Sequence, residues 1–388
     1  MLKVSMVDLH GQYLKIKDQI DQAIQEVINS TAFINGPQVD LFVEELASWL
    51  GVKYVIPCGS GTDALQIALM SLDLSPGDEV AVPVHTYAAS AEVIALLKLK
   101  PVFVDVDPLT FTIDVKQFEE KLTSRTKAVI PVHLFGQCAN MEALGKLAQR
   151  YNLKIVEDTA QALGAKYKYS DGSQVYAGTM GDFGTTSFFP TKNLGCFGDG
   201  GALFTNDDLL AKKAKMIANH GQSKKYYHEI IGCNSRLDSI QAAILRVKLQ
   251  HLNDYNSIRR EIASFYDKAF LQIPAVKIPV RADYSTHIFN QYTILVHGRK
   301  SSVSLRDQLR SRLLQAGIPS VVYYPKPLHL QNAYCINGYG VGSFPVAERL
   351  CEIGLSLPIH TEMREEQLNY IVTAVNQNLV ELAGKEAN

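Results

Sequence analysis

Lys192 is the residue of this chain best suited to covalent chemistry. It lies between the apolar residues 187–190 (SFFP) and 194–197 (LGCF), and a glycine-rich turn follows. Burial disfavours the charged form of an amine, and a neutral amine can attack a carbonyl carbon to form a Schiff base. An ordinary loop lysine is the competing interpretation, and this stretch alone does not decide between the two.

Two polar side chains follow the apolar residues 154–156. Asp158 either caps a helix or directs its carboxylate into a crevice, and Gln161 three residues later could complete a capping box. In the functional alternative, Asp158 pairs with the protonated ring nitrogen of a cofactor and Gln161 donates to a neighbouring ring oxygen. The sequence leaves both interpretations open.

A glycine-rich turn, Ser60-Gly61-Thr62, separates an expected strand from an expected helix. The first amides of a helix have no partner within the helix, and its dipole adds positive potential there, so such a turn can hold a phosphate. A routine helix N-cap has the same composition. The turn lacks the lysine that completes a nucleotide-binding P-loop.

Three further side chains could contact a ligand. Tyr87 is either a core aromatic or a ring that stacks on a heterocycle. Asn234 and Arg236 precede an expected helix, and an arginine fork matches a two-oxygen anion such as phosphate or carboxylate. No second histidine stands at metal-ligand spacing from His85, so we expect no metal.

The elements that must position these residues follow an alternating pattern. Segments of helical period separate short apolar runs, and this alternation predicts an α/β fold with a mostly parallel sheet. Ligands gather at the carboxyl ends of such strands. The expected strands are residues 54–57, 79–83, 101–106, 128–132 and 154–157, and the expected helices include residues 9–30, 37–49, 62–72 and 238–252, with more helix through residue 270.

Beyond residue 272 the pattern changes to a smaller α+β domain. This domain is expected to contain a strand at residues 292–296 and a helix at residues 304–315. We place the larger domain at residues 1–250 and the smaller one at 251–388, with the boundary in helix rather than in a flexible linker. No internal repeat is evident.

Composition excludes several classes of protein. The 388 residues are 47% hydrophobic with a formal net charge of −1, so no global field attracts nucleic acid or an anionic membrane. The first residues, MLKVSMVDLHGQY, have no apolar signal core. The six cysteines form no CxxC pair. We expect a cytoplasmic enzyme without membrane or nucleic-acid partners.

Taken together, the motifs resemble the sugar aminotransferases of the DegT and StrS group, which are pyridoxal-phosphate enzymes of the aspartate-aminotransferase fold (fold type I). The resemblance implies a seven-stranded, mostly parallel sheet. It spans nearly the whole chain and is specific because the motifs occur in the family's order. They are VDLHGQY, INGPQV, SGTDALQIAL, PVHTYAAS, PVHLFGQ, EDTAQALGA, SFFPTKN with GDGGA, GCNSRLDSIQAAIL and YYPKPLH.

The resemblance implies a role for each candidate residue. Lys192 would hold pyridoxal 5'-phosphate as a Schiff base and later carry a proton between the coenzyme and the sugar. Asp158 would keep the pyridine nitrogen protonated, so that the ring accepts electrons. The other expected cofactor contacts are Gln161 at the ring hydroxyl, Tyr87 on the ring face, and Gly61, Thr62 and Ser187 at the phosphate, with Asn234 reaching that phosphate from the second subunit of a homodimer.

The resemblance also implies a substrate. The motifs are most similar to the branch that aminates C3 of a UDP-linked 3-keto-N-acetylhexosaminuronate with L-glutamate, for surface polysaccharides such as the lipopolysaccharide O-antigen. Arg236 would meet the sugar carboxylate, and Tyr323, Tyr324 and His329 would face the sugar across the dimer interface. Enzymes for dTDP-3-keto-6-deoxyhexoses share NSRLD, and Tyr323 departs from the histidine of the uronate branch, so the sugar stays open.

Two rival classes are less well supported. A carbon–sulfur lyase or a racemase of the same fold would need an arginine in the smaller domain for an α-carboxylate, and none stands in a convincing motif. A non-enzymatic regulator that binds the cofactor would call for a DNA-binding segment, and the chain has none to spare. Lysine at position 192 argues against the dehydratases of the group, which carry histidine there.

Overall fold

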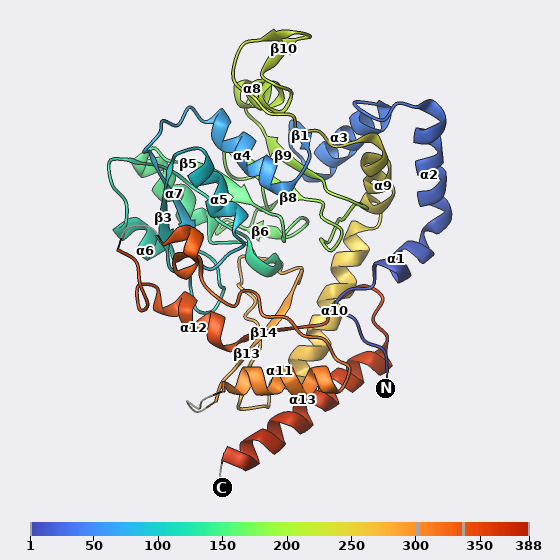
Figure 1. Ribbon diagram of the computed structural model, residues 1–388, viewed down its shortest axis with the longest axis vertical. Helices are drawn as coiled ribbons and strands as arrows, with labels where there is room; N and C mark the ends of the chain where they lie inside the picture. The colour runs from blue at the N-terminus through green and yellow to red at the C-terminus, as the bar shows by residue number, and fades with distance from the viewer. Residues whose placement is uncertain (1, 299–302, 336–337, 387–388) are drawn as a thin grey trace.

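A seven-stranded mixed sheet with helices on both faces forms the centre of the larger part of the chain (Figure 1). The computed structural model describes residues 2–298, 303–335 and 338–386. Across the sheet, the strands run in the order β1 (Tyr54–Cys58), β9 (Gly201–Thr205), β8 (Phe183–Ser187), β5 (Lys154–Asp158), β4 (Thr126–Val129), β2 (Glu79–Pro83) and β3 (Lys100–Val104).

Most neighbours in this sheet are parallel, as predicted. Strand β9 is antiparallel to β1 and β8, whereas the pairs from β8 through to β3 are parallel. Strands buried on both faces need near-continuous apolar runs, and all five residues of β2 are buried. Strands β8 and β9 were not predicted, because β8 carries Thr185 and Thr186 in place of apolar residues and β9 begins at a glycine.

Most helices of the larger part connect these strands or cover the faces of the sheet, whereas the first two pack on the last one. Their bounds are α1 (Leu9–Lys15), α2 (Lys17–Ser30), α3 (Pro37–Leu50), α4 (Gly61–Ser71), α5 (Ala89–Leu96), α6 (Val115–Glu120), α7 (Met141–Tyr151), α8 (Asp208–Ala218) and α9 (Ser239–Leu249). The prediction of one helix over residues 9–30 is wrong. Ile16 leaves helical geometry (φ −124°, ψ 20°), and its buried side chain packs with Ile20 and Ile244.

The remaining elements build a second hydrophobic core around a three-stranded antiparallel sheet. These elements are α10 (Leu252–Phe270), β12 (Val276–Lys277), β13 (Tyr292–Val296), α11 (Leu305–Gln315), α12 (Pro345–Ile353), β14 (Gly354–Leu357) and α13 (Glu365–Glu386). The helix expected to continue through residue 270 is interrupted between α9 and α10. The domain boundary at residue 250 stays a prediction.

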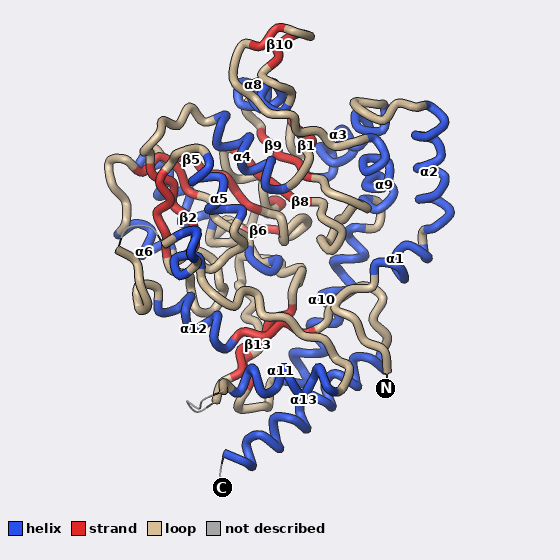
Figure 2. Tube along the Cα trace, in the orientation of Figure 1, coloured by secondary structure: helices blue, strands red, loops and turns tan. Residues whose placement is uncertain are grey.

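Short elements complete the secondary structure (Figure 2). They are the hairpins β6 (Lys166–Lys168) with β7 (Gln174–Tyr176) and β10 (Gln222–Lys224) with β11 (Tyr227–His228), and the 3-10 turns η1 (Leu134–Gly136), η2 (Leu328–Leu330) and η3 (Asn332–Tyr334). The β10 hairpin projects from the top of the molecule in Figure 1. No helix in the described part of the chain combines the length and the apolar character needed to cross a membrane.

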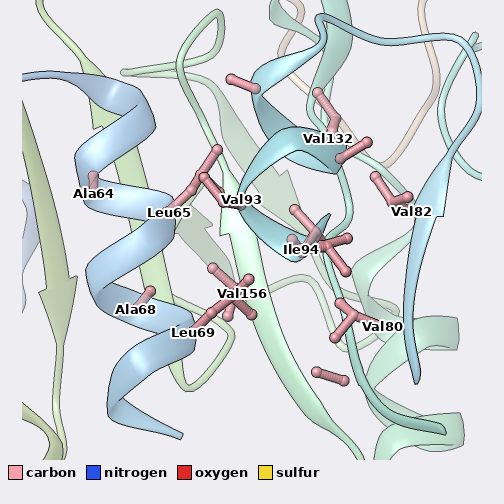
Figure 3. Close-up of a cluster of buried hydrophobic side chains, with 14 of the residues drawn as sticks. Ala64, Leu65, Ala68, Leu69, Val80, Val82, Val93, Ile94, Val132 and Val156 are labelled. Atoms are coloured by element: carbon pink, nitrogen blue, oxygen red, sulfur yellow. The ribbon is translucent and has the colours of Figure 1, made fainter. Parts of the chain in front are cut away.

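Apolar packing against the sheet fixes the position of α4, whose first residues reach the ligand site. Buried side chains of this helix, among them Leu65 and Leu69, lie against Val156 of β5 and Val93 of α5 (Figure 3). Burial of a leucine side chain stabilises the fold by about 2 kcal/mol. The N-terminus of α4 is therefore held rigidly beside the ends of β5 and β8.

A buried carboxylate fixes the end of β5. Glu157 accepts hydrogen bonds from backbone amides at residues 178, 180 and 181, at 2.6–2.8 Å, and from Nε2 of His133 at 2.9 Å. Nδ1 of His133 accepts from the amide of Ala139, so the ring carries its proton on Nε2. A buried charge is stable only when hydrogen bonds replace water, and Glu157 satisfies that condition. Its neighbour Asp158 is thereby held at the strand end.

Candidate active site

A cavity of about 430 Å³ opens at the carboxyl ends of β5 and β8. The start of α4, the loop at residues 189–199, the segment 290–291 and the pair 323–324 complete its wall. The structure brings together many of the side chains that the sequence singled out. Those that line this cavity are Gly61, Thr62, Tyr87, Asp158, Gln161, Ser187, Lys192, Tyr323 and Tyr324.

Lys192 lies at the tip of a tight loop that follows β8. The amide of Cys196 donates to the carbonyl of Phe188 at 2.8 Å and closes the loop. A side chain at Gly195 would stand 2.4 Å from the carbonyl oxygen of Pro190, so only glycine permits this turn. The fold of the loop thus places the lysine in the cavity wall.

Burial lowers the pKa of the Lys192 amine, and the negative charge of Asp158 opposes that shift. Among the described residues, no side chain or carbonyl forms a hydrogen bond with its Nζ. An amine with a lowered pKa and no competing partner is available as a nucleophile and as a carrier of protons.

Asp158 ends β5 with its carboxylate at the cavity. Oδ2 accepts from Oγ of Ser90 at 2.9 Å, and Oδ1 accepts from the amide of Ala160 at 3.0 Å. Residues 160–164 form turns rather than a helix, so Asp158 caps no helix. Oγ1 of Thr86 lies 3.5 Å from Oγ of Ser90. Sequence reasoning did not single out Ser90, although it closes the motif PVHTYAAS.

Gln161 is fixed by its own hydrogen bonds. Oε1 accepts from the amide of Phe135 at 2.7 Å, and Nε2 donates to the hydroxyl of Tyr324 at 3.3 Å, so no capping box forms. Burial raises the pKa of Tyr324, and its phenol keeps its proton. The ring of Tyr87 is 63% exposed and lies 6.2 Å from that of Tyr324. Tyr87 therefore offers a free aromatic face at the cavity.

The start of α4 combines a cap with free hydrogen-bond donors. Oγ of Ser60 accepts from the amide of Asp63 at 3.1 Å, which confirms the N-cap. The amides of Gly61 and Thr62 have no partner within the helix. A Cβ at Gly61 would lie 2.6 Å from Cβ of Ser187, and the Ser187 oxygen already accepts from the amide of Phe189, so its hydroxyl proton can point outward. Capping and phosphate binding are thus compatible here.

Three predicted site residues do not line the cavity of their own chain. Asn234 is exposed, and Arg236 donates to the side-chain oxygens of Asn234 (2.5 Å) and Asn219 (2.9 Å). His329 is buried, with Nε2 at 3.1 Å from a carboxylate oxygen of Glu348, and burial lowers its pKa. These predictions therefore rest on the resemblance and not on placement in one chain.

Other cavity residues were missed by the sequence reasoning. Thr191 and Asp199 belong to the lysine loop, while Asn290 and Gln291 come from the connection into β13. Asn290 and Gln291 belong to no recognised motif. They lie about a hundred residues from Lys192 in the sequence, so only the fold brings them to the cavity. Within the described ranges, no group of three or more His, Cys, Asp or Glu side chains could hold a metal ion.

Comparison with known proteins identifies the family of this chain. The model of the DegT/DnrJ/EryC1/StrS aminotransferase family matches residues 14–376. This chain belongs to that family. It is 45% identical over 376 residues (96% of this chain, 98% of the other) to a "Pleiotropic regulatory protein" of Geobacillus stearothermophilus. It is also 40% identical over 372 residues (96% and 99%) to the UDP-2-acetamido-2-deoxy-3-oxo-D-glucuronate aminotransferase of Pseudomonas aeruginosa.

The similarity extends to dTDP-sugar enzymes and to solved structures. The chain is 39% identical over 375 residues (97% and 96%) to a dTDP-3-amino-3,4,6-trideoxy-alpha-D-glucose transaminase of Streptomyces venezuelae. The crystal structure of S. venezuelae DesV with a ketimine intermediate superposes with a TM-score of 0.92 at 39% identity (97% of this chain, 98% of DesV). That of Bacillus subtilis NtdA with the cofactor PMP superposes at 0.88 and 29% identity (97% and 85%).

The family establishes the class of enzyme and its cofactor. This chain is a sugar aminotransferase of fold type I, and its cofactor is pyridoxal 5'-phosphate. The cavity fits that group, because it offers an unpaired amine with a lowered pKa, the carboxylate of Asp158 and the free amides at residues 61–62.

The charge of Asp158 should control the titration of Lys192. Because that charge raises the lysine pKa, the Asp158→Asn variant should have a still lower pKa at Lys192. More of the amine is then neutral at a given pH. In the cofactor-free protein, the rate of Lys192 acylation against pH, followed by peptide mass spectrometry, should shift to lower pH.

Exposed lysines of the same sample, such as Lys116, provide the control, and their profiles should not move. A Lys192 profile that stays in place or shifts to higher pH would show that Asp158 does not act on this amine.

Proposed function

We propose that this aminotransferase transfers the amino group of L-glutamate to the C3 keto group of a UDP-linked 3-keto-N-acetylhexosaminuronate. The observation that carries the proposal is the unpaired Lys192 amine in one cavity with Asp158. The 40% identity to a UDP-3-oxo-glucuronate aminotransferase supports the choice of sugar. The guanidinium of Arg236 suits the carboxylate of that sugar, and the dTDP-sugar branch carries the same arginine in its NSRLD motif.

The cavity residues divide the chemical work. When bound, pyridoxal phosphate carries the amino group between the substrates and stabilises negative charge at the reacting carbon. The Asp158 carboxylate keeps the ring nitrogen protonated, and Ser90 and the amide of Ala160 hold that carboxylate in place. Lys192 binds the coenzyme and, when its amine is free, takes a proton from one carbon and returns it to another.

The walls of the cavity bind and orient. The amides of Gly61 and Thr62 and the Ser187 hydroxyl donate to the phosphate, where the dipole of α4 adds positive potential. Tyr87 covers the ring face. One proton of the Gln161 Nε2 group goes to Tyr324, and the other is free for the ring hydroxyl oxygen. The Tyr323 and Tyr324 phenols face the sugar.

Asn234 and Arg236 act in the site of a second subunit. Both lie outside the cavity of their own chain, at the start of α9. Beside them, the exposed side chains of Phe33 and Ile34 flank the same helix start, because the Phe33 carbonyl accepts from the amide of Ser239. Exposed apolar residues next to ligand-binding polar ones favour an interface between copies. A symmetric homodimer would bury them and complete both sites.

A dTDP-linked 3-keto-6-deoxyhexose is the second candidate substrate. Among the described residues that line the cavity, Lys192 is the only lysine or arginine, and Asp158 and Asp199 are the acidic residues. A 6-deoxyhexose carries no carboxylate, so its sugar ring, unlike that of a uronate, needs no cation from the second subunit. The 39% identity to a dTDP-sugar transaminase supports the same choice. Arg236 is common to both branches, so only its replacement can test whether it meets a sugar carboxylate.

A non-enzymatic regulator is the more remote alternative. The Geobacillus relative carries the name of a regulatory protein. A regulator that only senses the cofactor has no need for a free lysine amine opposite a buried carboxylate, and that pair is what amino transfer requires. Bleaching of the yellow enzyme by L-glutamate, with release of 2-oxoglutarate, separates the two functions.

Replacement of Arg236 should change the choice of sugar. The Arg236→Gln variant should lose about 100-fold in kcat/KM for the UDP-linked 3-keto-uronate, since a charge-assisted arginine pair contributes about 3 kcal/mol. Its activity on a dTDP-3-keto-6-deoxyhexose should fall far less, because that sugar has no carboxylate and only the hydrogen bonds of Arg236 to Asn234 and Asn219 are lost. Mass spectrometry of the amino sugar, with glutamate as donor, measures both reactions.

Arg349→Gln is the matched control, because Arg349 is an exposed arginine on α12 that pairs with Glu352. Wild-type activity confined to the deoxyhexose would move the assignment to the second candidate. Formation of no amino product from any 3-keto nucleotide sugar would overturn both.

The shared site can be tested by mixing inactive variants. Lys192→Ala and Asn234→Ala homodimers should each be strongly impaired. After they are denatured and refolded together, about a quarter of wild-type activity should return, since about half of the dimers are mixed and each mixed dimer has one intact site. Turnover by the mixture and by each variant alone measures this. Recovery no greater than the sum of the separate variants would contradict a site built from both subunits.

A further inference from the structure

The residue that follows the cofactor lysine is tied into a buried amide network. Nδ2 of Asn193 donates to Oδ1 of Asn256 on α10 at 2.6 Å, and Oδ1 of Asn193 accepts from Nδ2 of Asn290 at 2.9 Å. The three side chains are 2–5% exposed. Nδ2 of Asn256 donates in turn to the carbonyl of Leu163 at 3.3 Å. Buried amides paired on both sides fix the atoms that carry them.

The Asn256 side chain of this network fits only because residue 164 is a glycine. Gly164 has a φ of +98°, and a Cβ there would stand 2.4 Å from Nδ2 of Asn256. Nδ2 of Asn193 also approaches the carbonyl of Ile288 at 3.4 Å. The network thus joins the lysine loop, α10 and the connection into β13 at one point.

The connection at residues 288–291 is itself rigidly held. The Arg259 guanidinium on α10 is buried and donates to the carbonyls of Phe289 (3.1 Å) and Asn290 (3.3 Å). Within the described part of the chain it pairs with no carboxylate, and burial lowers its pKa to about 10. The amide of Ile288 donates to the Gly136 carbonyl at 2.9 Å. The segment that holds Asn290 therefore cannot shift without loss of several buried bonds.

We propose that Asn193 is a positioning residue for Lys192, acting through Asn256 and Asn290. The network fixes the backbone directly after the lysine, so that only the flexible side chain of Lys192 moves when its amine changes between the bound and the free state. The amine then stays within reach of the coenzyme in both states. The inference rests on the proposed function, because it assumes that Lys192 is the residue that binds the cofactor.

The effect should appear in the rate at which the cofactor attaches. Addition of pyridoxal phosphate to cofactor-free protein should form the visible Schiff-base absorbance at least about tenfold more slowly in Asn193→Ala and in Asn290→Ala. The first variant loses the hydrogen bonds of Asn193 to both partners, and the second loses the bond between Asn290 and Asn193. The double variant should be no slower than Asn193→Ala, because both changes break one network.

Hydrogen exchange gives a second measure that needs no cofactor. Amides of residues 189–197 should exchange about tenfold faster in the cofactor-free Asn290→Ala protein than in the wild type. Asn140→Ala is the matched control. It removes an asparagine that caps α7 and bonds Tyr167 but forms no hydrogen bond with Asn193, Asn256 or Asn290, and both attachment and loop exchange should stay unchanged.

The outcomes separate the possible failures. Wild-type attachment rates in both single variants, or strictly additive effects in the double variant, would overturn the positioning role. If Asn193→Ala does not fold, Asn290→Ala, which keeps Asn193, decides by the same two measures. Attachment at a lysine other than Lys192 in the wild type would refute the proposed function and with it the positioning role. Faster loop exchange in Asn290→Ala would then show only a structural network.

Discussion

Desolvation of one amine is the constraint on which the rest of the site depends. The walls around Lys192 exclude water from its amine, which lowers the pKa of that amine. The negative charge of Asp158 partly offsets this lowering. Without the first effect the amine would be a protonated surface charge with no nucleophilic character. Without the second, it would lose the field that holds a proton near the reacting atoms. The loop closed by the Phe188 carbonyl and the Cys196 amide holds the amine where both effects act.

The sheet supplies the other half of this arrangement. Strands β5 and β8 are parallel neighbours, so their last residues lie side by side at the same edge of the sheet. Glu157 faces the turn at residues 178–181 and is satisfied there, whereas Asp158, one residue later, faces the cavity. The alternation of side chains along a strand thus places one carboxylate in a structural role and the next at the ligand.

Much of this could be predicted from the sequence, because its signals are local. Apolar runs placed strands β1 to β5 within a few residues, and polar residues after the runs converge as expected. Residues that act through tertiary packing could not be found: Asn290 and Gln291 reach the cavity, and the buried Ser90 reaches the Asp158 carboxylate. Strands β8 and β9 were not predicted, because threonines in β8 and a glycine in β9 interrupt the apolar run expected of a buried strand. Ile16, where the first helix is broken, packs against α9. The hydrophobic periodicity of residues 9–30 contains no sign of that tertiary contact.

Reduction of the holoenzyme with borohydride, followed by peptide mass spectrometry, tests the central claim about Lys192 most directly. Reduction makes the bond between cofactor and protein permanent, so the modified peptide identifies the attached residue. We predict that the cofactor mass appears on the peptide that contains Lys192 and is absent from the same peptide of Lys192→Ala. Attachment to another lysine, or undiminished turnover by Lys192→Ala, would contradict the assignment.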